Sequence, residues 1–124
     1  MLRKIVTYGS NFIDFYSEQN KNVQDKIDYV FELIKTLDII PNRFFQHLES
    51  TDALFEIRVE YEGNIYRIIC FFDEGNLVVL INSFQKKSQK TPRKEIELAK
   101  SLKKQYFIDK EIDKANEKRK KVKK

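Results

Sequence analysis

The sequence predicts an α+β domain in which two N-terminal helices pack on one face of a small antiparallel sheet and a basic helix follows. Apolar residues between 22 and 38 recur at three- and four-residue steps, which is the period of a helix. Between residues 54 and 84 the period changes to two, as in strands. With 124 residues, the chain is long enough for one hydrophobic core and too short for two domains.

The elements before the sheet follow from these periods and from capping residues. Residues 4–8 alternate as a short strand, and Ser10 or Asn11 then offers an N-cap for a first helix. The continuous apolar face of residues 22–38 predicts the second helix. Residues 42–53 keep neither period, so we expect a loop with one short helical turn there.

Gly63-Asn64 is a two-residue hairpin signal and predicts the turn between the first two strands of the hairpin. With the turn placed there, Ile57 would face Cys70 and Glu60 would face Arg67. One face of the hairpin is then apolar and packs on the helices. The opposite face carries charges from Glu56, Arg58, Glu60 and Arg67.

A second turn at residues 73–76 leads into the strand that follows. The alternation places Val79 and Ile81 on the core face of this strand. The positions that extend the charged face are Asn82, Phe84 and Lys86.

Thr91-Pro92 predicts the start of the last helix, with Thr91 as cap and Pro92 in the first turn. The packing side of this helix ends near residue 108. The remaining stretch is basic, has no apolar face and is expected to be frayed or disordered. We therefore expect one domain over residues 1–108 and a basic extension over residues 109–124.

Charge divides the chain sharply. Residues 1–85 carry 8 Lys and Arg against 13 Asp and Glu, whereas residues 86–124 carry 16 against 6. The net charge of +5 is the sum of these opposed parts, which favours a polyanionic partner for the second part.

Several classes of protein fit the composition poorly. No apolar run approaches the roughly 20 residues that cross a bilayer, and the N-terminus lacks the pattern of a signal peptide, so a cytoplasmic location is expected. Cys70 is alone, which favours a buried, inert thiol. With the single His47 and no clustered ligand spacing, we expect no metal site and no cofactor.

The chemistry expected of the charged face is phosphodiester recognition. Guanidinium groups bind phosphate oxygens in pairs, and clustered cations lower the pKa of a neighbouring lysine so that it can act as a base. Unpaired bases could stack on Phe84, Tyr66 or Tyr106. The bland alternative is a cross-strand ion-pair ladder beside a solubilising basic loop. Candidates for binding nucleic acid are Arg58, Phe84, Lys86, Arg93 and Lys94.

Four segments in order resemble the HigB-like branch of the RelE/ParE toxin superfamily: Leu54–Val59, Tyr66–Ile68, Phe84–Pro92 and Glu95–Lys100. The resemblance covers roughly residues 42–108. It implies the toxin of a type II toxin–antitoxin pair, typically a ribosome-dependent endoribonuclease that cuts mRNA. The implied partner is a helix-turn-helix, HigA-like antitoxin, and a heterotetramer is one assembly that the resemblance allows.

Carried over by position, the resemblance gives Arg67 the task of stabilising the phosphorane and makes Lys87 or Lys90 the candidate base. Arg58, Lys86 and Lys87 would bind the RNA backbone. Relatives often place a late His or Tyr as the acid or stacking group, and nothing between residues 84 and 105 fills that role here.

Two other functions remain open on sequence grounds. A ParE-like protein of the same fold would poison DNA gyrase and leave mRNA uncut. A non-catalytic RNA-binding module would be harmless when expressed alone, and its affinity would fall steeply as salt rises.

Overall fold

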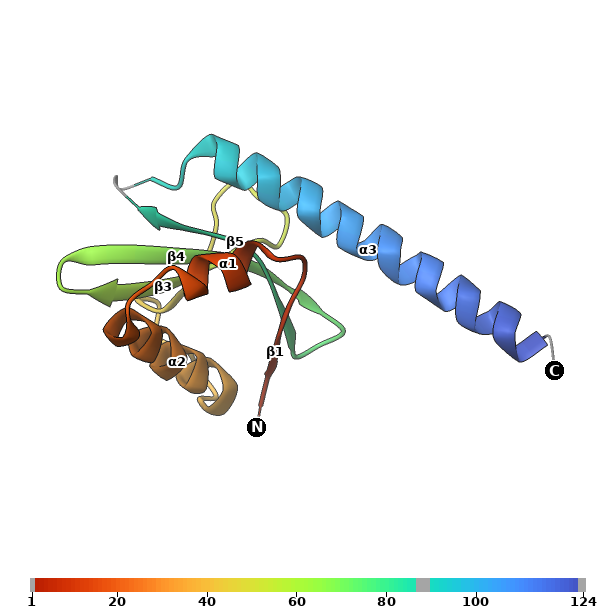
Figure 1. Ribbon diagram of the computed structural model, residues 1–124, viewed down its shortest axis with the longest axis horizontal. Helices are drawn as coiled ribbons and strands as arrows, with labels where there is room; N and C mark the ends of the chain where they lie inside the picture. Colours follow the sequence, from red (N-terminus) through yellow and green to blue (C-terminus); the bar gives the residue numbers. More distant parts are fainter. Residues whose placement is uncertain (1, 87–89, 123–124) are drawn as a thin grey trace.

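The protein is described here by a computed structural model that covers residues 2–86 and 90–122, the last four by their backbone alone (Figure 1). It has the expected α+β architecture, with a five-stranded sheet of order β1-β5-β4-β3-β2. In chain order the elements are β1 Lys4–Thr7, α1 Asn11–Ser17, α2 Lys21–Thr36, β2 Phe45–His47, β3 Phe55–Tyr61, β4 Asn64–Asp73, β5 Leu77–Lys86 and α3 Arg93–Val122.

Helices α1 and α2 cover one face of the sheet, as the sequence predicts (Figure 1). Asn20 caps α2 with its side-chain oxygen, which accepts from the Val23 N–H at 3.0 Å. The buried face of α2 packs on residues such as Ile57 and Ile68 of the hairpin. The α2 residues in this core are Val23, Ile27, Val30 and Ile34, which keep the helical spacing.

The sheet differs from the prediction at both edges. Strand β1 runs parallel to β5, so the sheet is antiparallel only from β5 to β2. Within residues 42–53 the structure has the short strand β2 where we predicted a loop with a helical turn. The reason is tertiary: β3 offers free backbone groups at its edge, and Phe45 both pairs with Ile57 and stacks on Phe55 at 5.3 Å between ring centroids.

The hairpin register is two residues away from the predicted one. Tyr61 pairs with Asn64, so the turn is Glu62-Gly63, and both turn residues have positive φ (48° and 80°). Two successive positive φ angles are the signature of a type I′ turn, which matches the twist of the strands. A shift of two residues keeps every side chain on its predicted face but changes its partner. Arg58, not Glu60, therefore lies opposite Arg67.

A bulge corrects a second prediction. The pairing of β4 with β5 shifts between Ile68 and Cys70, because β5 has two residues between the partners where β4 has one. The extra residue reverses the alternation along β5. Val79 and Ile81 therefore lie in a second apolar cluster, away from α1 and α2, whose buried members are Leu54, Ile69, Phe71, Val79, Ile81 and Ala99. Phe84 and Lys86 lie on the charged face, as predicted, opposite Arg67 and Ile65.

Helix α3 packs over the face of the sheet that carries this second apolar cluster, and not at the sheet edge. Ala99 is fully buried against the cluster that contains Ile69 and Phe71. The segment predicted to be disordered after residue 108 is helical to Val122 and projects from the body (Figure 1). Its Lys, Glu and Ala content favours helix, and Lys114 pairs with Glu111 one turn away. No helix in the described part of the chain is long and apolar enough to span a membrane.

Thr91 is not the cap of α3. The helix begins at Arg93, and its first backbone hydrogen bonds run to the Pro92 carbonyl. The N–H of Glu95 donates to that carbonyl at 3.0 Å. The Thr91 hydroxyl donates to the Glu56 carboxylate at 2.6 Å, which ties the start of α3 to the charged face of the sheet.

Candidate active site

Three cationic side chains from three adjacent strands lie on one sheet face. Arg58 on β3 is directly opposite Arg67 on β4, and Lys86 on β5 pairs with Ile65, two residues before Arg67. Arg67 and Lys86 are only 7% and 8% exposed, so these charges lie in the protein interior. Directly opposite strand neighbours such as Arg58 and Arg67 are about 5 Å apart, and diagonal ones such as Arg67 and Lys86 about 7–8 Å. At these spacings the charges of Arg67 and Arg58 act on Lys86, so the three cations form one electrostatic unit.

Glu56 balances part of this charge. It is 2% exposed, and one carboxylate oxygen accepts from Arg67 while the other accepts from Thr91. This pairing holds the Arg67 guanidinium in place and leaves its remaining donors for another acceptor. Arg58 pairs with Glu60 at 3.0 Å, but Glu60 is exposed to solvent. The Lys86 amine, in contrast, has no hydrogen-bonded carboxylate partner among the described residues.

Lys86 is the unusual member. Its Nζ is buried and has no hydrogen-bond partner among the described residues. Burial, then the charges of Arg67 and Arg58, lower the pKa of Lys86 from 10.5 to about 8. With that pKa, about one molecule in ten carries a neutral Lys86 amine at pH 7. A neutral amine beside two guanidinium groups can take a proton from an acid that binds between them.

The buried polar atoms without a partner point to the ligand. Among the described residues these atoms include Arg58 Nε, Arg67 Nε and Lys86 Nζ, all on one face and all donors on cationic groups. A buried donor without an acceptor is costly, so a site with three of them is chemically suited to an anion. A tetrahedral phosphate offers several acceptor oxygens and negative charge together.

The other described residues predicted to bind or cleave nucleic acid lie on β5 and near the start of α3. Phe84 is half-buried opposite Arg67 and packs in part against the second apolar cluster. Lys90, Arg93 and Lys94 are exposed at and just before the start of α3. Lys87 lies outside the described residues. Because Lys86 has burial and two guanidinium neighbours, the geometry favours it over Lys90 as the base.

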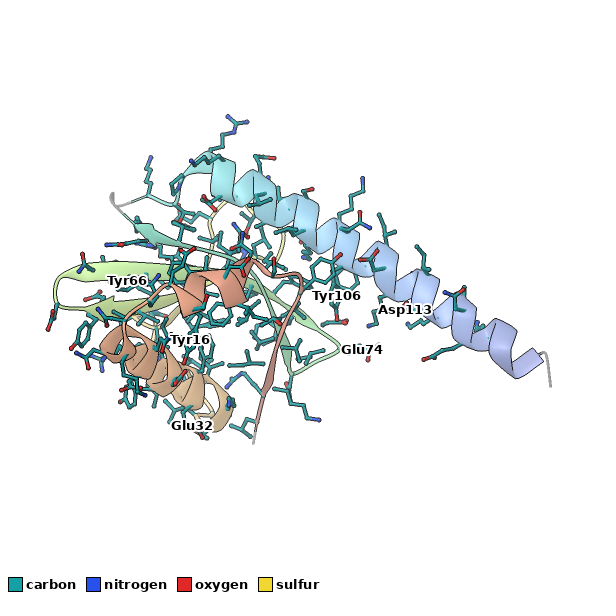
Figure 2. All side chains as sticks on the ribbon, in the orientation of Figure 1. Tyr16, Glu32, Tyr66, Glu74, Tyr106 and Asp113 are labelled. Carbon is teal, nitrogen blue, oxygen red and sulfur yellow. The ribbon has the colours of Figure 1, made fainter. Side chains whose placement is uncertain are left out.

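Two tyrosines predicted as stacking candidates are committed to packing. Tyr66 is 6% exposed and lies against Phe15 of α1 (Figure 2). The Tyr106 hydroxyl donates to Asp73 at 2.7 Å, and burial together with that carboxylate raises the pKa of Tyr106 to about 12. Neither ring is available for an RNA base. Cys70 is buried as expected, and burial raises the pKa of its thiol.

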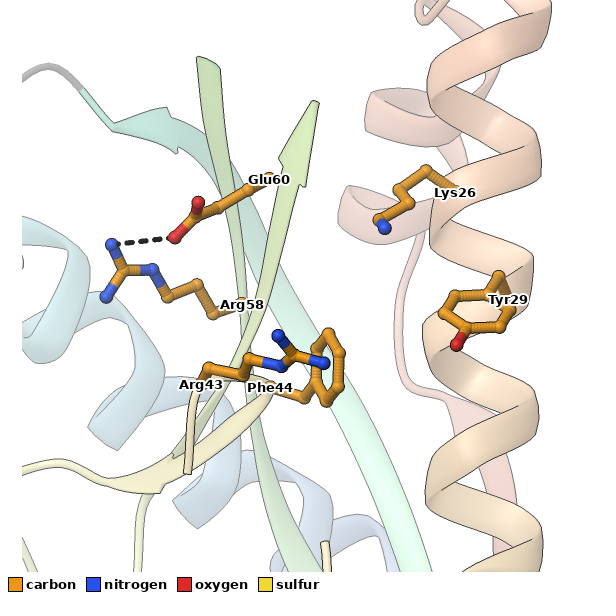
Figure 3. Close-up of a pocket in the computed structure, with 6 residues that line it drawn as sticks. All are labelled: Lys26, Tyr29, Arg43, Phe44, Arg58 and Glu60. Atoms are coloured by element: carbon orange, nitrogen blue, oxygen red, sulfur yellow. Dashed lines mark ion pairs between the residues drawn. The ribbon is translucent and has the colours of Figure 1, made fainter. Parts of the chain in front are cut away.

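A hollow of about 300 Å³ lies beside Arg58, between β3 and α2 (Figure 3). No sequence motif predicts this hollow, because its lining comes from separate elements. These elements meet where β2 stops pairing with β3 and leaves the edge of β3 uncovered. The lining residues are Lys26, Tyr29, Arg43, Phe44, Arg58 and Glu60.

Residues 14–104 match the family described as Phage derived protein Gp49-like (DUF891). The chain belongs to this Gp49-like family. The family is RelE-like and toxin-like, of the kind found in toxin–antitoxin systems. No curated protein matches the sequence. The matched range contains the three cations, Glu56 and all the residues that line the hollow. In the described part of the chain, no group of three or more His, Cys, Asp or Glu side chains could hold a metal ion.

Proposed function

We propose that this Gp49-like protein is the toxin of a type II toxin–antitoxin pair, on the HigB-like branch, and cuts mRNA on the ribosome without a metal ion. The observation that carries the proposal is the buried, unpaired Lys86 Nζ beside Arg58 and Arg67. Family membership supports the toxin class, and this cluster supports the ribonuclease chemistry.

The reaction begins at the ribose 2′-hydroxyl. Neutral Lys86 accepts the 2′-OH proton, and the 2′-oxygen attacks the adjacent phosphorus. Negative charge then builds on the non-bridging oxygens, where the guanidinium groups of Arg67 and Arg58 stabilise it. The bond from phosphorus to the 5′-oxygen breaks, and that oxygen takes up a proton from water, while the proton held by Lys86 returns to solvent. The products are a 2′,3′-cyclic phosphate and a 5′-hydroxyl end.

Positive charge replaces a metal ion in this scheme. Three cations against one buried carboxylate leave the site with a strong excess of positive charge. Arg67 is positioned by Glu56, so its guanidinium needs no rearrangement when the phosphorane forms. Preorganised charge of this kind is worth more in a buried site than in water.

We propose a helix-turn-helix, HigA-like antitoxin as the partner that holds the toxin inactive in the cytoplasm. A neighbouring reading frame for such a protein, and its co-purification with this chain, would test that partnership. Absence of any stable partner encoded beside the gene would contradict it.

The function is tested by inducing the chain in cells and mapping 5′ ends of mRNA. We expect new 5′-hydroxyl ends within coding sequences, lost in Lys86→Met and retained in Lys21→Met, which removes an exposed charge on α2. Intact mRNA with a DNA-damage response would show gyrase poisoning instead. Intact mRNA with normal growth would show a non-catalytic RNA-binding module.

A further inference from the structure

The hollow beside Arg58 occupies the open edge of the sheet. Strand β2 pairs with β3 only as far as Ile57, and the Arg58 N–H then bonds to the Phe44 carbonyl at 2.9 Å. Beyond that bond, β3 has no neighbouring strand on this side within the described residues. Helix α2 forms the opposite wall, so the hollow opens between strand edge and helix (Figure 3).

The lining combines flat rings with cations. The Arg43 guanidinium lies over the Phe44 ring at 4.6 Å, and Lys26 Nζ lies 5.2 Å from the centroid of the Tyr29 ring. Tyr29 is 53% exposed, so its ring is open to a ligand. A stacked guanidinium presents a flat surface on which an aromatic base can add.

The charge of the lining is unbalanced. Of the described residues that line the hollow, Lys26, Arg43 and Arg58 are cationic, and Glu60 is the one carboxylate. Glu60 already pairs with Arg58, as Figure 3 shows. Lys26 and Arg43 are therefore the cations left for a ligand. A volume of about 300 Å³ is at the lower end of small-molecule sites, which suits a single nucleotide.

Arg58 connects the hollow to the candidate active site. It lines the hollow and also lies directly opposite Arg67 on the next strand. Its Nε is buried without a hydrogen-bond partner among the described residues. The phosphate backbone of an RNA strand bound at Arg67 would therefore pass Arg58 and continue toward Lys26 and Arg43.

We propose that this hollow binds one nucleotide of single-stranded RNA next to the phosphate that is cut. Its base stacks on the exposed Tyr29 ring, and its phosphate contacts Lys26 and Arg43. The assignment rests on the proposed ribonuclease function, because it takes the RNA strand to run from the Arg67 cluster across Arg58. Single-stranded nucleic acid is commonly bound by this pairing of basic groove and aromatic platform.

The test uses the full chain and a short RNA that carries 2′-O-methyl groups, so that binding is measured without cleavage. One base is replaced by fluorescent 2-aminopurine, whose emission falls on stacking. The variants are Lys26→Met/Arg43→Met, which removes the two cations, and Tyr29→Leu, which removes the exposed ring. The matched control, Lys4→Met/Lys21→Met, removes two exposed charges outside the hollow.

We expect the Lys26→Met/Arg43→Met variant to lose about tenfold or more in affinity at constant salt, and the control about twofold or less. In Tyr29→Leu the quenching of 2-aminopurine should be weaker than in the native chain. Equal losses in variant and control, with unchanged quenching, would overturn the subsite.

Failure of the proposed nucleotide site can be distinguished from failure of the proposed ribonuclease function. If the hollow variants bind RNA as the native chain does while Lys86→Met abolishes mRNA cleavage, the subsite is wrong and the function stands. If the hollow variants lose affinity while the native chain leaves mRNA intact, the ribonuclease function is wrong and the hollow is a site of RNA binding alone.

Discussion

Two charge clusters, each containing buried charged residues, lie at opposite ends of the same sheet face, and they are built differently. At the end of β4, Asp73 is 6% exposed and accepts from Tyr106 at 2.7 Å and from Lys110 at 2.8 Å. Near the start of β4, Arg67 has one carboxylate partner, and Lys86 has none among the described residues. We refer to these as the balanced cluster (Asp73, Glu74, Tyr106, Lys110) and the cationic cluster (Glu56, Arg58, Arg67, Lys86).

The lysines of the two clusters show what the difference means. Hydrogen bonds from Lys110 to Asp73 and Glu74 raise the pKa of Lys110, so it stays charged. Burial and the two arginines lower the pKa of Lys86 to about 8. The balanced cluster satisfies its own charges and fastens α3 to the sheet. The cationic cluster costs the free protein stability, because its excess positive charge is buried without a matching acceptor among the described residues.

Substituting the two lysines should separate chemistry from structure, and this is the largest effect we expect. Lys86→Met should reduce mRNA cleavage by about 100- to 10,000-fold, the usual contribution of a general base. Its free energy of unfolding should stay level or rise, because a buried unpaired charge is removed. Lys110→Met should retain cleavage and lower stability. Mapping of 5′ ends measures cleavage, and urea unfolding measures stability. If the two variants behaved alike in both measurements, the proposed difference between the lysines would be wrong.

Arg67→Ala should damage both fold and function. Removal of the guanidinium leaves the buried Glu56 carboxylate with Thr91 as its partner among the described residues, and we expect a loss of about 3 kcal/mol in unfolding free energy. Adding Glu56→Gln should restore much of that stability without restoring cleavage. Urea unfolding of the single and double variants measures this. An Arg67→Ala protein as stable as the native chain would mean that the Arg67–Glu56 pair does not hold the site together.

Tyr106→Phe tests the balanced cluster with a smaller change. The hydroxyl donates to a buried carboxylate, so its loss should lower the free energy of unfolding by about 1.5 kcal/mol. Lys110 still neutralises Asp73, and RNA cleavage should not change. Loss of cleavage with retained stability would place Tyr106 in the chemistry after all.

The pH dependence of stability should have the same sign for the two clusters but fall in different pH windows, because the folded pKa values of Lys86 and Asp73 both lie below their ordinary values. Lys86 has a folded pKa of about 8, below its usual 10.5, so the unfolded chain binds more protons between those values and Lys86 makes stability rise with pH there. Burial acts to raise the pKa of Asp73, but Lys110 and Tyr106 hold it below its ordinary value. That contribution is present above about pH 4 and is lost as pH falls further.

Comparison of each variant with the native chain isolates these contributions. The difference in stability between Lys86→Met and the native chain should narrow from pH 8 to 10. The difference between Asp73→Asn and the native chain should shrink as pH falls below about 4. Parallel curves for all three proteins would contradict both assignments.

The sequence predicted the layers of the fold and the shared face of the three cations because alternation in strands depends on parity alone. It failed where a single backbone conformation decides the pairing. Positive φ at Glu62 moved the hairpin turn by one residue and the pairing register by two, and the bulge in β5 moved Val79 and Ile81 to the other face. Neither Glu62 nor the bulge carries a glycine that would mark it in the sequence.

The candidate site was predictable in part for the same reason. Arg58, Arg67 and Lys86 could be placed on one face, but their burial could not, because Glu56 and Thr91 close the cluster through a contact between residues 35 positions apart. That contact also explains why Thr91 does not cap α3. The hollow at Lys26 and Arg43 depends on how far β2 extends along β3, which local sequence does not specify.

The central claim is that Lys86 titrates near pH 8, well below an ordinary lysine, whereas Lys110 stays protonated there. NMR titration of lysine Cε shifts in the full chain, with Lys86→Met and Lys110→Met to assign the signals, measures it directly. We predict a midpoint of about 8 for Lys86 and a signal for Lys110 that does not titrate below pH 10. A Lys86 signal that titrates above pH 10 together with the exposed lysines would contradict the account.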